Sequence, residues 1–102
     1  MGYVEVGEAS EVVDGEIAAF AVGHHEIAVT RVDGVLYAFA DVCTHRRCNF
    51  STGADLDGTD LICECHGAVF DVRTGEVLAP PATDRLSTYP VREVDGKVEV
   101  EV

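Results

Sequence analysis

The chain has 102 residues, the length of one domain, and its 47% hydrophobic and 25% charged residues are typical of a globular protein. Nineteen acidic residues against seven basic ones give a net charge of −12, which argues against binding to nucleic acid or anionic membranes because their phosphates would repel this surface. Apolar runs are far shorter than the ~20 residues that cross a bilayer, so we expect no membrane span. The first residues lack the basic and apolar regions of a signal peptide, so we expect a cytoplasmic protein.

Short runs that alternate apolar and polar residues predict β-strands along most of the chain. No stretch keeps a helical period over three turns, so long helices are not expected. Four Asp-Gly pairs separate the runs, and both residues of such a pair tolerate the positive φ of tight turns. The clearest hairpin turns are Asp33-Gly34 and Asp95-Gly96. The expected strands are Tyr3–Val6, Glu16–Val22, Glu26–Val32, Val35–Ala40, Asp60–Cys63, Ala68–Asp71, Leu86–Glu93 and Lys97–Val102.

The segment 41–81 departs from this pattern. It holds all four cysteines, two of the four histidines and the pair Pro80-Pro81. In a cytosolic chain such cysteine clusters indicate a metal site more often than disulfides. We therefore expect one domain over residues 1–102, in which a small metal-binding subdomain at about 41–81 is set into a β-framework. The other two histidines, His24 and His25, lie beside Gly23 in an expected surface turn. The aromatic residues expected in the core are Tyr3, Phe20, Tyr37, Phe39 and Tyr89.

Two short motifs in this segment carry the candidate chemistry. The first is Cys43-x-His45, and after seventeen residues the second is Cys63-x-x-His66. Two loops that each offer one thiolate and one imidazole can hold a binuclear iron–sulfur cluster, with two sulfurs on one iron and two nitrogens on the other. A structural zinc site uses the same ligand types and stays an alternative. Zinc fingers usually keep like ligands together, so the mixed loops favour the cluster.

Together with Gly67, Phe70 and the proline-containing segment 77–82, these motifs resemble the Rieske iron–sulfur family over about residues 35–102. The resemblance implies an all-β fold, an antiparallel β-sandwich or barrel with a small cluster-binding subdomain at one end. It also implies one [2Fe–2S] cluster per chain. Cys43 and Cys63 would bind the inner iron and His45 and His66 the outer, solvent-facing one. The loop with Pro80 and Pro81 would cover the cluster.

The remaining cysteines, Cys48 and Cys65, are each in one of the two ligand loops. The resemblance to Rieske proteins of respiratory and photosynthetic complexes and of arsenite oxidase implies that these two form a disulfide tying the loops together. Such a bridge would stabilise the subdomain by roughly 2–4 kcal/mol. The alternative is a pair of thiols that the cytosol keeps reduced.

The chain differs from the respiratory members at several positions near the cluster. Those members have Ser and Tyr where this chain has Ala68 and Phe70, which offer no hydroxyl to the cluster sulfurs. Since such hydrogen bonds stabilise the reduced state, we expect a potential in the lower half of the Rieske range of about −150 to +300 mV. Arg47 and Glu64 replace the family's usual Gly and Pro. Arg46 and Arg47 either steer docking at the histidine end or are ordinary solvated residues.

The predicted function is that of a one-electron carrier and not of an enzyme. By resemblance, it takes electrons from a reductase and passes them to a terminal oxygenase of an aromatic-ring hydroxylating system or a similar acceptor. The chain contains neither a mononuclear iron site of the two-histidine, one-carboxylate kind nor a nucleotide-binding glycine loop. One alternative is a fixed electron-relay subunit of a larger redox complex. A second alternative is a zinc-binding module without redox function.

Overall fold

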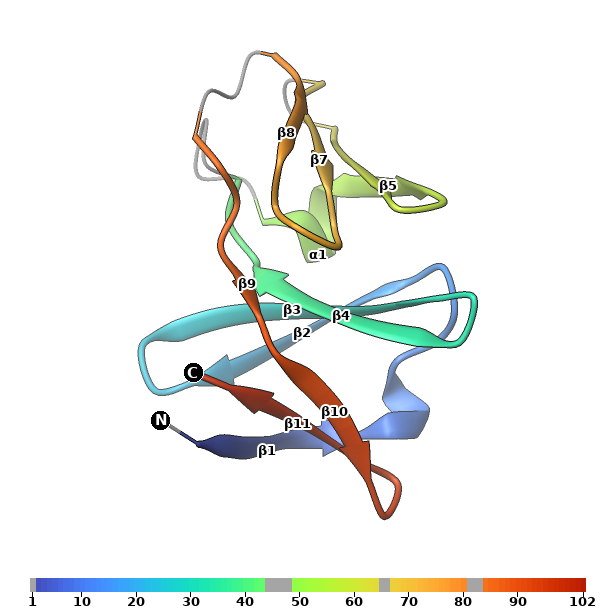
Figure 1. Ribbon diagram of the computed structural model, residues 1–102, viewed down its shortest axis with the longest axis vertical. Coiled ribbons are helices and arrows are strands. Elements are labelled where there is room, and N and C mark those ends of the chain that lie inside the picture. The colour runs from blue at the N-terminus through green and yellow to red at the C-terminus, as the bar shows by residue number, and fades with distance from the viewer. Residues whose placement is uncertain (1, 44–48, 65–66, 81–83) are drawn as a thin grey trace.

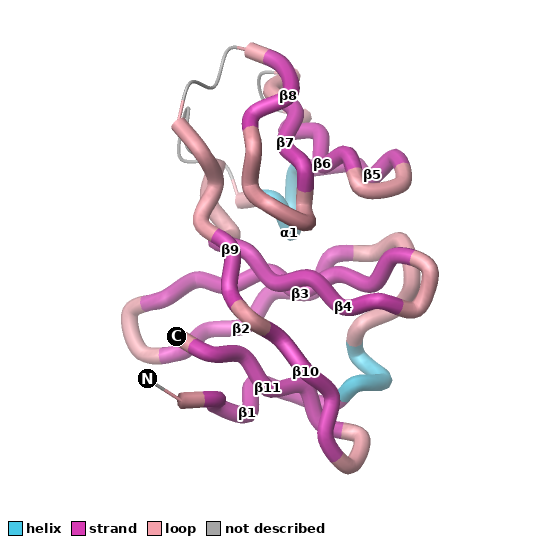
Figure 2. The backbone as a smooth tube through the Cα atoms, viewed as in Figure 1, coloured by secondary structure: helices cyan, strands magenta, loops and turns pink. Residues whose placement is uncertain are grey.

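The computed structural model describes residues 2–43, 49–64, 67–80 and 84–102. Strands dominate this part of the chain, and they form three antiparallel sheets (Figure 1). Two of the sheets make up a framework, and the third lies at one end of the molecule (Figure 2). The antiparallel all-β fold expected from the sequence is therefore confirmed.

The framework is built from the two halves of the chain that flank the cysteine-rich segment. Its first sheet has the strand order β1-β11-β10, and its second has the order β2-β3-β4-β9. The 3₁₀ turn η1 (Ala9–Glu11) links β1 to the second sheet. The strand bounds are β1 Tyr3–Glu8, β2 Ile17–Val22, β3 His25–Val32, β4 Val35–Ala40, β9 Thr88–Tyr89, β10 Val91–Val94 and β11 Lys97–Glu101.

The third sheet is formed only by the segment between the two motifs and the region after them. Its order is β5-β6-β7-β8, and the one-turn helix α1 precedes β5. In Figure 1 this sheet and α1 lie above the end of β4. The bounds are α1 Phe50–Gly53, β5 Ala54–Asp57, β6 Asp60–Cys63, β7 Val69–Asp71 and β8 Val77–Ala79.

Both hairpin turns that the sequence marked most clearly are present. Asp33 and Gly34 have φ values of 52° and 81°. They connect β3 to β4 and lie between Val32 and Val35, which are the last pair of the ladder. Asp95 and Gly96 connect β10 to β11 in the same way, with φ values of 51° and 76°. Two successive residues at positive φ define the turn whose twist matches paired strands, so these pairs set the register of both hairpins.

Three strand predictions need correction. The predicted strand Leu86–Glu93 is divided into β9 and β10, which belong to different sheets, and Pro90 lies between them. Because proline has no N–H to donate, it interrupts the ladder where the chain leaves one sheet for the other. Strands β5 and β8, which pair with β6 and β7 in the third sheet, were not predicted.

The core has two parts. One part lies between the two framework sheets and includes Ile27, Val29, Val98 and Val100. The other joins the end of the framework to the third sheet, and both motif cysteines belong to it. The expected place of Tyr3 in the core is wrong. Tyr3 is 36% exposed, and its ring lies under the Arg92 guanidinium, whose carbon is 3.9 Å from the ring centroid, as in a cation–π contact.

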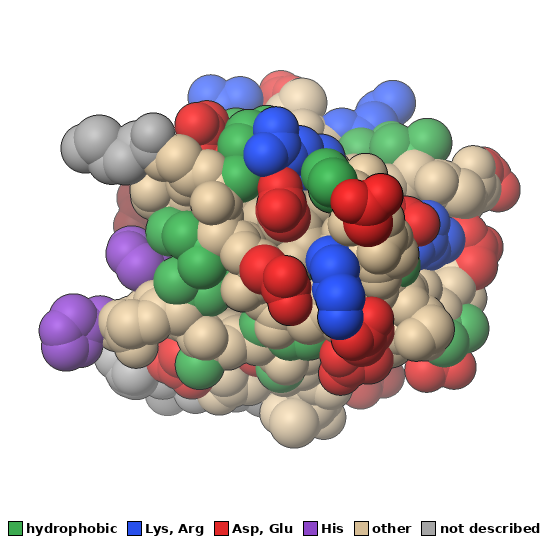
Figure 3. Space-filling view, turned by 90° about the horizontal axis from the view of Figure 1, so that it is seen from below, with side chains coloured by type: hydrophobic (Ala, Val, Ile, Leu, Met, Phe, Trp, Pro, Cys, Tyr) green, Lys and Arg blue, Asp and Glu red, His purple; other side chains and the backbone are tan. Residues whose placement is uncertain are grey.

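The face seen from below in Figure 3 is strongly acidic, with isolated basic side chains among the carboxylates. Of the five basic residues that the structure describes, four form ion pairs: Arg31 with Glu93, Arg73 with Asp71, Arg92 with Glu99 and Lys97 with Glu8. His24 and His25 are exposed, as predicted, and His25 is the first residue of β3. Among the described residues, no helix is long and apolar enough to cross a membrane.

Asp71 at the end of β7 is expected to stabilise the fold in its ionised form. Its carboxylate accepts hydrogen bonds from Arg73 Nε at 3.0 Å, Nη2 at 2.8 Å and the backbone N–H at 2.9 Å. The side-chain bonds from Arg73 lower the pKa of Asp71, although burial opposes them. A lowered pKa stabilises the native state above the unfolded value of about 3.9, and this contribution is lost as the pH falls through the native pKa.

We therefore expect Asp71→Asn to lower the free energy of unfolding at pH 7, by an amount that stays constant down to about pH 5 and shrinks below about pH 4. Urea unfolding of the two proteins across this range tests the prediction. A penalty that grows on acidification would contradict it.

Candidate metal centre

The first motif cysteine follows the end of a central framework strand. Strand β4 ends at Ala40, whose N–H donates to the carbonyl of Ser87 at 2.9 Å, and Cys43 comes three residues later with only 3% of its surface exposed. The Asp41 N–H donates to the Glu26 carbonyl on β3 at 2.9 Å. Where the chain leaves the sheet, it is thus hydrogen-bonded to the neighbouring segments on both sides, at Ser87 and at Glu26. These bonds place Cys43 at the end of the framework that faces the third sheet.

The second motif cysteine is the last residue of β6 and is fully buried. Its N–H donates to the carbonyl of Ala68 at 2.8 Å, and its carbonyl accepts from the N–H of Gly67 at 2.7 Å. Gly67 has a φ of +79°, which an L-residue rarely adopts, so glycine suits the closure of this loop. The Glu64 N–H donates to the Gly53 carbonyl at 2.8 Å and ties the loop to the end of α1. Cys63 therefore lies in a loop closed by its own backbone.

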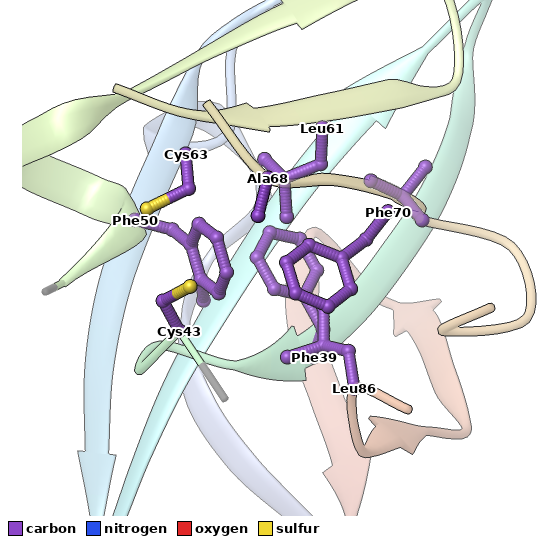
Figure 4. Close-up of a cluster of buried hydrophobic side chains, with 10 residues drawn as sticks. Phe39, Cys43, Phe50, Leu61, Cys63, Ala68, Phe70 and Leu86 are labelled. Carbon is purple, nitrogen blue, oxygen red and sulfur yellow. The ribbon is translucent and has the colours of Figure 1, made fainter. Parts of the chain in front are cut away.

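The two cysteines belong to one buried cluster, and Figure 4 shows their side chains beside the ring of Phe50. Phe50 packs edge-on against Phe39 and Phe70, with ring centroids 5.7 and 5.8 Å apart. These three rings, from β4, α1 and β7, belong to the same apolar cluster as the two sulfurs. Two buried thiols brought together from loops 20 residues apart offer the soft donors that iron–sulfur clusters and zinc both use.

The described residues around the cysteines confirm an apolar setting. Ala68 and Phe70 are fully buried, while Pro80 follows β8 and is exposed. The structure thus places Cys43, Cys63, Gly67, Ala68 and Phe70 in one region. The other predicted site residues lie outside the described residues: His45, Arg46, Arg47, Cys48, Cys65, His66 and Pro81. Their roles, including the disulfide between Cys48 and Cys65, stay predictions. No group of three or more metal-ligating residues occurs among the described residues alone.

Two residues of this region were not singled out from the sequence. Phe50 is 1% exposed, and its ring packs against Phe39 of the framework and Phe70 of the third sheet. Asp41 is 2% exposed and accepts hydrogen bonds from residues at the start of α1. The sequence marks neither, because α1 has a single turn and leaves no periodic pattern. The segment Asn49-Phe50-Ser51 contains residues common at helix starts, but such a signal does not identify a partner that lies eight to ten residues away.

Comparison with known proteins adds independent information on this site. The model of the Rieske [2Fe-2S] domain family matches residues 2–90. The anthranilate 1,2-dioxygenase ferredoxin subunit of Burkholderia cepacia is 38% identical over 97 residues, which cover 95% of this chain and 89% of the relative. A ferredoxin of Sphingomonas yanoikuyae B1 superposes with a TM-score of 0.91 at 32% identity, with 99% of both chains covered.

A second solved structure contains a ferredoxin together with its partner. It is the complex of reduced oxygenase and oxidized ferredoxin in carbazole 1,9a-dioxygenase, and the matched chain has a TM-score of 0.87 at 36% identity. The match covers 96% of the present chain and all of that chain. Buried paired thiols, the antiparallel framework and the extent of the family match all agree. This chain belongs to the Rieske [2Fe-2S] domain family.

Proposed function

We propose that the protein is a ferredoxin, a one-electron carrier that receives electrons from a reductase and delivers them to a terminal oxygenase. The observation that carries the proposal is the pair of buried cysteines, Cys43 and Cys63, brought into one apolar cluster from two loops. The likeness to proteins named as ferredoxins, over nearly the whole length of each, supports a carrier over a fixed relay subunit of a larger complex. No substrate turnover is proposed for this chain.

The residues that would hold the [2Fe–2S] cluster are Cys43 and Cys63 on one iron and His45 and His66 on the other. When bound, the cluster supplies a site that takes up and returns a single electron. The protein's own contribution is to bury both thiols and to exclude water from them with Phe50 and its neighbouring rings.

We make three further proposals, on the domain, the cellular compartment and a disulfide. Residues 1–102 form one Rieske domain, with a cluster-binding subdomain at about 41–81. The protein works in the cytoplasm, which cell fractionation tests. Cys48 and Cys65 form a disulfide, for which we expect alkylation of the unfolded, non-reduced protein to label neither cysteine. Labelling of both would contradict the disulfide without affecting the proposed ligands.

Electron delivery is the decisive test of the proposed function. The protein is reduced with dithionite, freed of excess reductant under anaerobic conditions and mixed with the oxidised oxygenase of the carbazole 1,9a-dioxygenase or anthranilate 1,2-dioxygenase system. We expect its visible absorption to return as the oxygenase is reduced, at a rate proportional to the oxygenase concentration. A protein that keeps its electron in the presence of both oxygenases would overturn the proposal.

The apolar surroundings of the thiols predict how the potential responds to an added hydroxyl group. Ala68 is fully buried next to Cys63 and offers no donor. Ala68→Ser introduces an O–H that favours the more negative reduced state, so we expect the potential to rise by about 40–90 mV, the equivalent of a hydrogen bond worth roughly 1–2 kcal/mol. Ala38→Ser, in the other part of the core, is the matched control and should leave the potential unchanged. An equal shift in both variants, or none in either, in a spectroelectrochemical titration would count against this explanation.

A further inference from the structure

Asp41 is a buried carboxylate that the ligand set does not include. It follows β4, precedes Cys43 by two residues and is 2% exposed. Burying a carboxylate is costly unless hydrogen bonds replace its hydration. Its place in the fold therefore depends on the donors around it.

Among the described residues, the donors to this carboxylate lie on the other side of the first motif, at Asn49 and Ser51. Asp41 Oδ1 accepts from the backbone N–H of Ser51 at 2.8 Å, and Oδ2 accepts from Ser51 Oγ at 2.6 Å. The Asn49 side-chain amide donates to Oδ2 at 3.3 Å and to Glu26 Oε1 at 3.2 Å. A carboxylate has about four acceptor positions, and described donors occupy three of them here.

These bonds replace the local cap of α1. Asn49 occupies the N-cap position of the helix but makes no side-chain capping bond. The first N–H groups of a helix lack partners within the helix, and a carboxylate is a strong acceptor for them. Asp41 takes this role for Ser51 from ten positions earlier in the sequence. The start of α1 is thus fixed to the end of β4 and not to its own flanking residue.

We propose that Asp41 is a positioning residue for Cys43, because it fastens together the two ends of the chain segment that carries this cysteine. Position 41 is on the entering side of the segment, and positions 49 and 51 are on the leaving side. Phe50, between the two donors, packs in the same buried cluster as both Cys43 and Cys63. Asp41, two residues before Cys43, is therefore bonded to both residues that flank the ring beside the thiol. This inference rests on the proposed role of Cys43 as a cluster ligand.

The test compares Asp41→Ala and Asp41→Asn with a substitution of Asp71, a second buried and hydrogen-bonded carboxylate, which is the last residue of β7; the control is Asp71→Asn. Two properties are measured on the loaded proteins: the EPR spectrum after dithionite reduction and the rate of iron release to ferrozine without denaturant. For Asp41→Ala we expect shifted or broadened g-values and iron release at least about tenfold faster, the equivalent of one lost charge-assisted hydrogen bond. Asp41→Asn should lie in between, since its carbonyl can still accept from the Ser51 N–H. Asp71→Asn should match the wild type.

Equal iron release and equal EPR spectra in Asp41→Ala and Asp71→Asn would overturn the inference, because Asp41 would then contribute only to general stability. If Asp41→Ala does not fold, Ser51→Ala removes one of the three bonds, and an unchanged release rate in that variant would also overturn it. Wild-type protein without iron and acid-labile sulfide would instead refute the proposed function, so the two failures are distinguishable.

Discussion

Replacing Cys63 by Ala is expected to abolish cluster binding, whereas Cys65→Ala, two residues later, retains the cluster. Cys63 is fully buried, and its backbone closes the second ligand loop on Gly67 and Ala68. Without its thiolate, one iron would have an open position against the apolar part of the site, where the one other described soft donor is Cys43, itself already assigned as a ligand. Since iron–sulfur clusters need a full set of protein ligands, we expect less than about a tenth of the wild-type iron and sulfide in Cys63→Ala.

Iron and acid-labile sulfide per chain, together with visible absorption, measure this effect. The histidines allow the same comparison of a proposed ligand with a control. His66→Ala should lose the cluster. His24→Ala should keep it, because His24 is exposed in the turn before β3. If Cys65→Ala loses iron as completely as Cys63→Ala, the assignment of Cys43, His45, Cys63 and His66 as the ligands is wrong.

The largest expected effect on stability comes from Gly75→Ala. Gly75 lies in the turn between β7 and β8 at a φ of +81°, and its carbonyl accepts from the Leu86 N–H at 2.8 Å. A Cβ atom at this position would be 2.0 Å from the Leu86 carbonyl oxygen and 3.3 Å from Thr88 Cγ2. This turn is where the third sheet contacts the chain segment that returns to the framework. The substitution must therefore push the two parts of the molecule apart.

The left-handed conformation alone costs an L-residue roughly 1–2 kcal/mol, and the backbone clash adds to it. We expect Gly75→Ala to lose about 3 kcal/mol or more, a large part of the 5–15 kcal/mol that is typical of a small domain. Gly34→Ala is the matched control, since Gly34 also has a φ of +81° but a Cβ atom added there would have no neighbouring atom within 4 Å. Urea unfolding of both variants separates the cost of the positive φ, which both share, from the cost of the contact with Leu86, which only Gly75→Ala has. Equal losses would show that the contact with Leu86 does not matter.

The features predicted correctly from the sequence are those that short stretches of chain determine. The Asp33-Gly34 and Asp95-Gly96 turns and strand β6 all follow from local residue types and spacing. The family assignment is confirmed by the match over residues 2–90.

The features that were missed depend on contacts between distant segments. Strand β8 forms because β7 offers a neighbour, and the division at Pro90 depends on which sheet each side of the chain joins. The role of Asp41 requires α1 to fold against the end of β4. Tyr3 is predicted to be buried from its residue type alone, but its place on β1 near Arg92 leaves it partly in solvent. None of these outcomes is contained in a local pattern.

The EPR spectrum of the purified protein after dithionite reduction, read with its iron and sulfide content, tests the central claim most directly. We expect a red-brown protein with two irons and two sulfides per chain. It should bleach on reduction and give a rhombic signal whose average g-value lies below that of all-cysteine clusters. A colourless, EPR-silent protein that contains zinc and no sulfide, and that does not take up a cluster on reconstitution, would contradict the account.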